Sequence, residues 1–199
     1  MKKVAIITLF CFFICSSFAQ SIVWKEVASL PEAYNGGEAI NLNNEIYFVA
    51  GRTKTTRSSA SFYKFNPEKN QWTKLADIPN PATNFALAAV KGKIYAIGGD
   101  QFQDANREYN PKTNSWKLLN PMPTARQHIN CGVYESEIYI AGGLTSWKNI
   151  TQKHEVYNVL TDSWSEKAAI PNLVQNASVV TIDSLIYVIG GAGAEEDIW

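Results

Sequence analysis

Short apolar segments rich in β-branched and aromatic residues recur along the chain, separated by polar stretches that contain Gly, Asn and Pro. Residues 85–90 and 94–97 are two such segments, and Lys91-Gly92-Lys93 between them is typical of a tight turn. Two further short segments follow at 107–110 and 116–119. No long segment has the 3.6-residue spacing of an amphipathic helix. The pattern predicts an all-β fold in which each unit contains four short antiparallel strands.

The unit repeats along the chain. A six-residue segment that begins with Ile-Tyr and ends in Gly occurs four times, at successive offsets of 48, 44 and 48 residues. Its copies begin at Ile46, Ile94, Ile138 and Ile186. A second series has the same spacing, and each member precedes a proline by seven residues: Trp24, Trp72, Trp116 and Trp164. Two independent series with one period establish an internal repeat.

Four short antiparallel strands in 40–50 residues describe one blade of a β-propeller. We expect the propeller to occupy residues 20–199. Its predicted parts are three whole blades at about 36–76, 84–120 and 128–168, a partial blade at 176–199, and a lone fourth strand at 22–28. About three and a half blades are too few for a closed ring, because propellers have four to eight. The sequence therefore predicts an incomplete ring.

The repeat resembles that of the kelch family. The Gly pair after Ile-Tyr is similar to the double-glycine signature of the family, and an aromatic residue precedes the Trp by seven positions in three copies (Phe65, Tyr109 and Tyr157). The resemblance extends over residues 24–191, with Ala50 in place of the first Gly of the first copy. It implies a kelch-type propeller, usually of six or seven blades, whose signature residues hold the blades together and perform no chemistry.

The first 19 residues differ from the rest. Lys2 and Lys3 precede an apolar run at 4–13, and Ser17-Phe18-Ala19 places small residues where a signal peptidase cuts. The run is shorter than the ~20 residues of a transmembrane helix. We predict a signal peptide at 1–19, a secreted or periplasmic protein, and no membrane span after cleavage. An uncleaved anchor is the alternative.

Composition excludes several classes of function. The 18 basic residues balance the 18 acidic residues, so no broad positive field favours nucleic acid as a partner. Cleavage would leave Cys131 as the one cysteine, which excludes an intrachain disulfide framework, and its apolar alignment column predicts a buried thiol. The sequence has two histidines and none of the common metalloprotease, nucleophile-elbow, Cys-x-x-Cys or phosphate-loop motifs. We predict no catalytic residue, metal site or cofactor.

Strand order places the loops between second and third strands at the same end as the connections between blades. We call this end the long-loop face, because these segments are longer and more varied than the tight turns opposite. Loops on a rigid scaffold commonly carry function. Arg52, Arg57 and Trp147 lie in these loops and suit an anionic or carbohydrate ligand. The alternative is that the loops are simply solvated.

Two columns of aligned positions offer further candidates near the mouth of the central channel. Ten residues before each repeated Ile lie Gly36, Asn84, His128 and Asn176. Their amide and imidazole groups can bind a ligand, or they can instead satisfy backbone groups between blades. Arg126 is the charged member of a second column whose other residues are Tyr34, Ala82 and Val174. A single charge at a ring position favours a role in ligand binding.

Two functions remain open. The first is a non-enzymatic extracytoplasmic binding module that holds a protein or glycan on its long-loop face. The second comes from a resemblance to exported kelch enzymes similar to sialic-acid mutarotases, which open a sugar ring by acid–base chemistry. Arg52, Arg57 and Arg126 would then hold the sugar carboxylate, although no acid–base pair is identifiable. The open sheet edge of an incomplete ring also predicts self-association.

Overall fold

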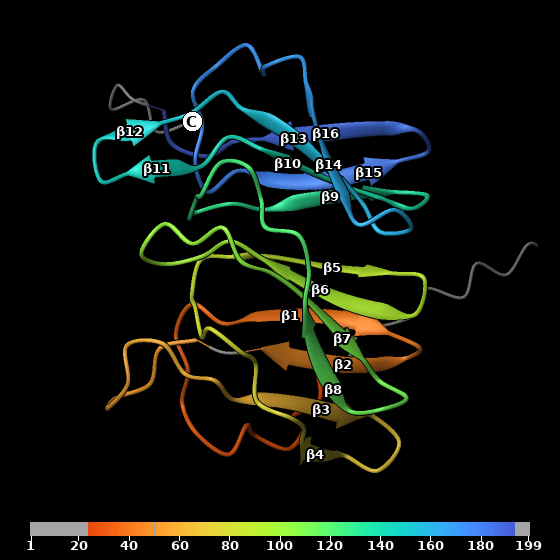
Figure 1. The fold of residues 1–199 in the computed structure, drawn as a ribbon. Coiled ribbons are helices and arrows are strands. Elements are labelled where there is room, and N and C mark those ends of the chain that lie inside the picture. Colours follow the sequence, from red (N-terminus) through yellow and green to blue (C-terminus); the bar gives the residue numbers. More distant parts are fainter. Residues whose placement is uncertain (1–23, 50, 194–199) are drawn as a thin grey trace, which may run out of the picture.

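The computed structural model describes residues 24–49 and 51–193, which form sixteen strands and no helix. The strands make three four-stranded antiparallel sheets, a two-stranded sheet and a separate two-stranded hairpin. Figure 1 shows the sheets stacked face to face along the chain. Each sheet is one blade, and the fold is an all-β propeller, as predicted from the repeat.

The first two blades have their strands in sequence order. Blade 1 consists of β1 (Glu38–Leu42), β2 (Glu45–Val49), β3 (Phe62–Asn66) and β4 (Gln71–Lys74). Blade 2 consists of β5 (Ala86–Val90), β6 (Lys93–Ile97), β7 (Asn106–Asn110) and β8 (Ser115–Leu118).

Blade 3 has the same order but carries an additional hairpin between its second and third strands. Its strands are β9 (Cys131–Tyr134), β10 (Glu137–Ala141), β13 (His154–Asn158) and β14 (Ser163–Lys167). The additional hairpin is β11 (Leu144–Ser146) with β12 (Asn149–Ile150). The fourth blade has two described strands, β15 (Ser178–Ile182) and β16 (Leu185–Ile189).

The tryptophan series ties each blade to the connection that enters it. The Trp116 ring lies 5.2 Å from the Tyr109 ring, and its Nε1 donates to the Ala76 carbonyl at 3.0 Å. Asn114 Oδ1 accepts from the Ala76 N–H at 3.0 Å and from the Tyr109 hydroxyl at 2.9 Å. The indoles of Trp72 and Trp164 make the matching bonds, at 2.8 and 3.0 Å. Each of these three tryptophans therefore contributes a directed hydrogen bond as well as apolar area.

The Gly pair is required by both backbone conformation and space. Gly98 and Gly99 have φ of 72° and 122°, in the region that favours glycine. A Cβ on Gly98 would lie 2.7 Å from the Arg126 carbonyl, and one on Gly99 would lie 2.5 Å from Ala82 Cβ. The Gly99 N–H donates to the Arg126 carbonyl at 3.0 Å. The signature glycines thus bring the end of one blade against the connection to the next.

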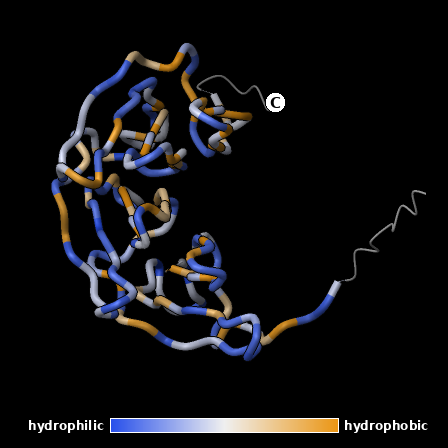
Figure 2. The backbone as a smooth tube through the Cα atoms, turned by 90° about the vertical axis from the view of Figure 1, so that its right-hand side faces the viewer, coloured by the Kyte–Doolittle hydropathy of each residue, from blue (hydrophilic) through white to orange (hydrophobic). Residues whose placement is uncertain are grey.

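The blades form an arc and not a closed ring, as Figure 2 shows. Buried apolar clusters fill the spaces between blades 1 and 2 and between blades 2 and 3. The expected lone strand at 22–28 is corrected over its described part, because residues 24–28 form no strand. In the three complete blades the fourth strand pairs with the third strand. The described part of the fourth blade contains no third strand, so residues 24–28 have no such partner there. No helix in the described ranges is long and apolar enough to cross a membrane.

Candidate functional site

A pocket of about 210 Å³ opens on the long-loop face, the side of Figure 1 that carries the β11–β12 hairpin. Residues from blades 1, 2 and 3 and from their connections line it: Arg52, Arg57, Asn84, Asp100, Gln101, His128 and Trp147. Five of the seven predicted ligand residues therefore border one cavity. The other two, Arg126 and Asn176, do not line it.

Backbone hydrogen bonds to the connection that enters the blade fix the residue that follows the last Gly of the repeated segment. Arg52 exchanges two backbone hydrogen bonds with Asn35, at 2.9 and 2.7 Å. Asp100 holds the equivalent position in blade 2, where its N–H donates to the Thr83 carbonyl at 2.9 Å. One structural position thus places a guanidinium in blade 1 and a carboxylate in blade 2, both beside the pocket.

The loops that carry Arg57 and Trp147 have internal structure. In the first loop the Ser59 N–H donates to the Gly51 carbonyl at 2.8 Å, and Arg57 is exposed. In the second, the β11–β12 hairpin presents Trp147, a residue that is 74% exposed. The Trp147 ring meets Phe102 edge to face, with centroids 5.3 Å apart. This arrangement leaves a large apolar surface beside the cationic side of the pocket.

The column of Asn84, His128 and Asn176 has two roles. All three residues have left-handed backbone, with φ of 56°, 56° and 53°, a conformation for which Asn and His are enriched. The His128 N–H donates to the Asn84 carbonyl, and the Asn176 N–H donates to the His128 carbonyl, both at 2.9 Å. These bonds between blades are made by the backbone of the column, whereas the side chains of Asn84, His128 and Asn176 bond to other side chains. Asn84 and His128 nevertheless also line the pocket.

Side-chain hydrogen bonds orient the polar groups that line the pocket. His128 Nδ1 lies 2.9 Å from Asn176 Oδ1, and because an amide oxygen only accepts, Nε2 is the ring nitrogen left for a ligand. Asp100 is buried and accepts from the Thr83 hydroxyl and, at 2.8 Å, from Asn84 Nδ2. Asn176 thus acts on the pocket through His128.

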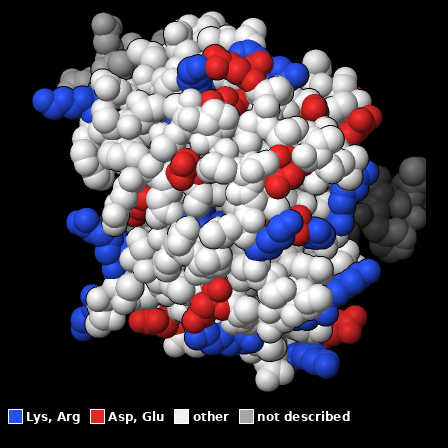
Figure 3. All heavy atoms as spheres, viewed as in Figure 1, with Lys and Arg blue, Asp and Glu red and all other residues white. Residues whose placement is uncertain are grey.

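Arg52 and Arg57 give the pocket its positive charge. Within residues 24–49 and 51–193, neither guanidinium lies within 4.0 Å of a carboxylate. Acidic and basic groups are interspersed over the side of the molecule seen in Figure 3, and no large area of that side carries one sign. The described residues contain no group of three or more His, Cys, Asp or Glu side chains placed to hold a metal ion. The attraction for an anion is therefore local to these two arginines.

The prediction that Arg126 binds ligand is wrong. Its side chain is fully buried, and its Nη2 pairs with Glu155 Oε2 at 2.6 Å. Its Nη1 donates to the carbonyls of Gly142 and Lys153, each at 3.0 Å. Burial lowers the pKa of Arg126, and Glu155 opposes that change. Arg126 is the charged member of its column because it forms an ion pair with Glu155 on β13. Its buried guanidinium is not accessible to a ligand.

Sequence reasoning missed Asp100 and Gln101 as pocket residues. A signal was present, because Asp100 directly follows the Gly pair of blade 2, the same position that Arg52 holds in blade 1. Comparison of that column across the repeats would have identified the carboxylate.

The chain is similar to kelch-repeat proteins over most of its length. The model of the KLHDC2/KLHL20/DRC7 Kelch-repeats domain matches residues 36–198. Kelch-like protein 41a of Danio rerio is 30% identical over 76 residues, 38% of this chain and 13% of that protein. Kelch-like ECH-associated protein 1A of the same fish is 34% identical over 80 residues, which is 39% and 13% of the two chains.

Two further likenesses concern distant proteins. Beta-scruin of Limulus polyphemus is 32% identical over 76 residues, 38% of this chain and 8% of that protein. The alignments to these three curated relatives thus span between 8% and 13% of the relatives' own length. The solved structure of YjhT superposes with a TM-score of 0.76 at 16% identity, covering 86% of this chain and 63% of the other. At that identity the likeness supports the fold alone.

Proposed function

Because the chain belongs to the kelch-repeat family, we propose that it is a non-enzymatic binding module that works outside the cytoplasm and holds a protein or glycan on its long-loop face. The observation that carries this proposal is the convergence of Arg52, Arg57, Asn84, His128 and Trp147 on one pocket. These residues come from separate repeats and from loops far apart in the sequence.

The pocket chemistry favours a carboxylate attached to a compact polar group. Two guanidinium groups pair well with a carboxylate, while Asn84 and the free nitrogen of His128 suit hydroxyl or amide groups. Trp147 provides a face on which a sugar ring or an apolar side chain can pack. A volume of about 210 Å³ is smaller than a drug-sized site, so it fits one sugar unit or one side chain. The surrounding loops would contact the rest of the ligand.

A glycan array and a pull-down from extracytoplasmic material test the proposal. We expect bound species that carry a carboxylate, and binding that Arg57→Gln removes. Lys112→Gln is the matched control, because Lys112 is an exposed cation in the tight turn between β7 and β8, on the opposite face. No ligand above background in either experiment, or equal binding by both variants, would contradict the proposal.

The location outside the cytoplasm rests on the predicted leader, which lies outside the described residues. Mass spectrometry of the protein from its native source should give an N-terminus at Gln20. A protein that retains residues 1–19 and remains in the cytoplasm would contradict this part of the proposal.

One observation favours the mutarotase-like alternative. Asp100 and His128, two side chains capable of proton transfer, line the same pocket as Arg52 and Arg57. A sugar held by its carboxylate would then lie within reach of an acid–base pair. NMR measurement of the rate of anomer interconversion, with and without the protein, distinguishes the two functions. A faster rate with the protein would support the enzyme, and an unaltered rate would exclude the mutarotase-like function.

A further inference from the structure

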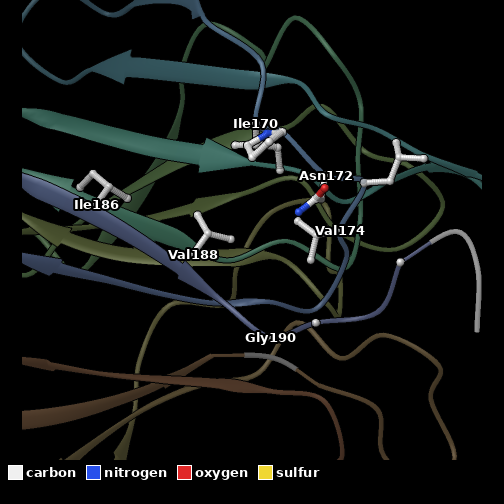
Figure 4. A pocket seen from close by; sticks show the side chains of 10 residues that line it. Ile170, Asn172, Val174, Ile186, Val188 and Gly190 are labelled. Carbon is white, nitrogen blue, oxygen red and sulfur yellow. The ribbon is translucent and has the colours of Figure 1, made fainter. Parts of the chain in front are cut away.

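Two cavities of similar volume differ in their lining. The first, of about 470 Å³, runs beside β16, and Figure 4 shows Ile170, Val174, Ile186 and Val188 on its walls. In the three complete blades a third strand covers the second strand, so this apolar groove suits a strand of the propeller. The second cavity, of about 450 Å³, has a mainly polar lining and suits a hydrophilic ligand.

The polar cavity lies on the long-loop face, between the connection that enters blade 2 and the loop between β6 and β7. Its lining residues are Asn80, Pro81, Gln101, Gln103, Asp104 and Ala105. We call it the Asp104 cavity. Blade 2 has a complete blade on either side, so this cavity is not at an open end of the arc.

Gln101 joins the Asp104 cavity to the pocket of the candidate site, because it borders both. We call that pocket, of about 210 Å³, the arginine pocket. A tight turn fixes Gln101 at the boundary: its backbone φ is 63°, and the Gln103 N–H donates to the Gly99 carbonyl at 3.0 Å. The two cavities are therefore neighbours, and two linked units of one ligand suit them.

The two cavities differ in charge. With Arg52 and Arg57 against one carboxylate, Asp100, the arginine pocket is net positive, whereas Asp104 is the one charged group among the described residues that line the other cavity. Burial lowers the pKa of Arg107, and Asp104 opposes that change. No Lys or Arg nitrogen of the described chain, however, lies within 4.0 Å of the Asp104 carboxylate. A ligand that is anionic at one end and carries no negative charge at the other fits this pattern.

Three side chains of the Asp104 cavity are available to a ligand. Gln103 is engaged, because its Nε2 donates to a backbone carbonyl at 3.2 Å and its Oε1 accepts from Arg107. Asn80, Gln101 and Asp104 are exposed, and their side chains make no hydrogen bond to another described residue. Two amides and a carboxylate are thus accessible beside the arginine pocket.

A sugar with several hydroxyl groups matches these side chains. An amide donates and accepts, a carboxylate only accepts, and a hydroxyl can satisfy either. A lysine ammonium would pair with Asp104 but only donates, which leaves the amide donors of Asn80 and Gln101 without a partner. A second carboxylate would meet the charge of Asp104, and like-charge contacts are unfavourable. The lining therefore favours an uncharged sugar.

On the basis of the proposed function, we propose that the ligand is an oligosaccharide in which an acidic sugar is linked to an uncharged one. The acidic sugar binds in the arginine pocket, and the uncharged sugar binds in the Asp104 cavity. Asp104 determines specificity, because its charge disfavours chains in which every sugar is acidic. The proposed function needs the arginine pocket alone, so the two proposals can fail separately.

Calorimetric titration with sugars of different length and charge tests the proposal. The probes are glucuronate, disaccharides that join glucuronate to glucose or galactose through several linkages, and digalacturonate with galacturonate as its reference. We expect at least one mixed disaccharide to bind about tenfold more tightly than glucuronate, the gain from one or two added hydrogen bonds. Digalacturonate should bind no more tightly than galacturonate, because its second carboxylate would meet Asp104.

Two variants separate the cavities. Gln101→Gly suits the left-handed backbone and should remove the advantage of the mixed disaccharide while glucuronate still binds. Asp104→Asn should strengthen digalacturonate binding relative to the mixed disaccharide, since the repelling charge is gone. Asp183→Asn, in the exposed tight turn between β15 and β16 on the opposite face, is the control and should change neither result. The thermal midpoint of each variant shows whether it is folded.

Glucuronate binding that depends on Arg57, with no advantage for any mixed disaccharide, would overturn this proposal and leave the proposed function intact. An advantage that Gln101→Gly and Asp104→Asn both leave unchanged would also overturn it. Tighter binding of N-acetylglutamyl-lysine amide than of any disaccharide would indicate a peptide ligand instead. If neither the sugars nor the peptide bind, the proposed function is contradicted as well.

Discussion

In blades 2 and 3 a buried arginine fills the space between the third strand and the connection that enters the blade, which we call the slot. The arginine belongs to the third strand in blade 2 and to the connection in blade 3. In blade 2, Arg107 extends from β7 and donates to the carbonyls of Pro79 and Asn80, at 2.9 and 2.7 Å. In blade 3, Arg126 extends from the entering connection and pairs with Glu155 on β13. Arg107 and Glu155 hold equivalent third-strand positions. The slot can thus hold one arginine among backbone carbonyls or an Arg–Glu ion pair, and neither position has a fixed residue type.

The difference between the two slots lies in how a buried charge is compensated. Burial lowers the pKa of Arg107 to about 10, so it is charged at neutral pH. Its guanidinium donates to backbone carbonyls and to Gln103 Oε1. Arg126 has a carboxylate as well as carbonyls. Blade 3 should therefore be more sensitive than blade 2 to the loss of a single partner.

The largest loss of stability should come from Glu155→Leu, which leaves the charge of Arg126 buried without its counter-ion. Such a loss costs about 3–5 kcal/mol of unfolding free energy. Urea denaturation measures it. The double variant Arg126→Met with Glu155→Leu should recover much of the loss, since no charge remains. Equal destabilisation by the single and double variants would contradict the proposed role of the pair.

A smaller effect is expected from Arg107→Met in blade 2. The change keeps the length of the side chain but leaves carbonyl groups of the slot without donors, at a cost of about 1–3 kcal/mol. The same denaturation measurement ranks it below Glu155→Leu. If Arg107→Met proved the more destabilising of the two, the comparison between the slots would be reversed.

The tryptophan bonds should give a smaller difference between the same blades. Trp116→Phe removes the half-buried bond to Ala76, with an expected loss of about 1 kcal/mol. Trp164→Phe removes the exposed bond to Asn120, where water can replace the donor, so the loss should be smaller. A larger loss for Trp164→Phe would show that packing and not the hydrogen bond decides the effect.

The smallest effect on stability should come from the arginines of the pocket. Arg57 is exposed and has no ion-pair partner among the described residues, so Arg57→Gln should change the unfolding free energy by less than ~0.5 kcal/mol. This separates the exposed arginines, which are free to bind a ligand, from the buried ones. A loss as large as that of Arg107→Met would remove the distinction.

Local pattern was sufficient to predict the strands, because turns and apolar runs are local properties. The strands expected at 85–90, 94–97, 107–110 and 116–119 agree with β5 to β8 to within a residue at each end. The repeat also predicted which loops share a face. Comparison of aligned positions gave the wrong role for Arg126, because that role is determined by the ion pair with Glu155, which lies in a different column. Asp100 was missed because the column of residues that follow the Gly pairs was not compared, and its bonds to Thr83 and Asn84 form no recognisable motif in the sequence.

The central claim, a carboxylate-binding pocket at Arg52 and Arg57, is tested most directly by saturation-transfer NMR with pairs of small probes. Glucuronate against glucose and N-acetylglutamate against N-acetylglutamine differ in the carboxylate and represent a glycan and a protein source, respectively. We predict that the carboxylate member of at least one pair gives the stronger signal. Arg57→Gln should remove that advantage, and Lys112→Gln should keep it. Equal signals within both pairs, or an advantage that survives Arg57→Gln, would contradict the account.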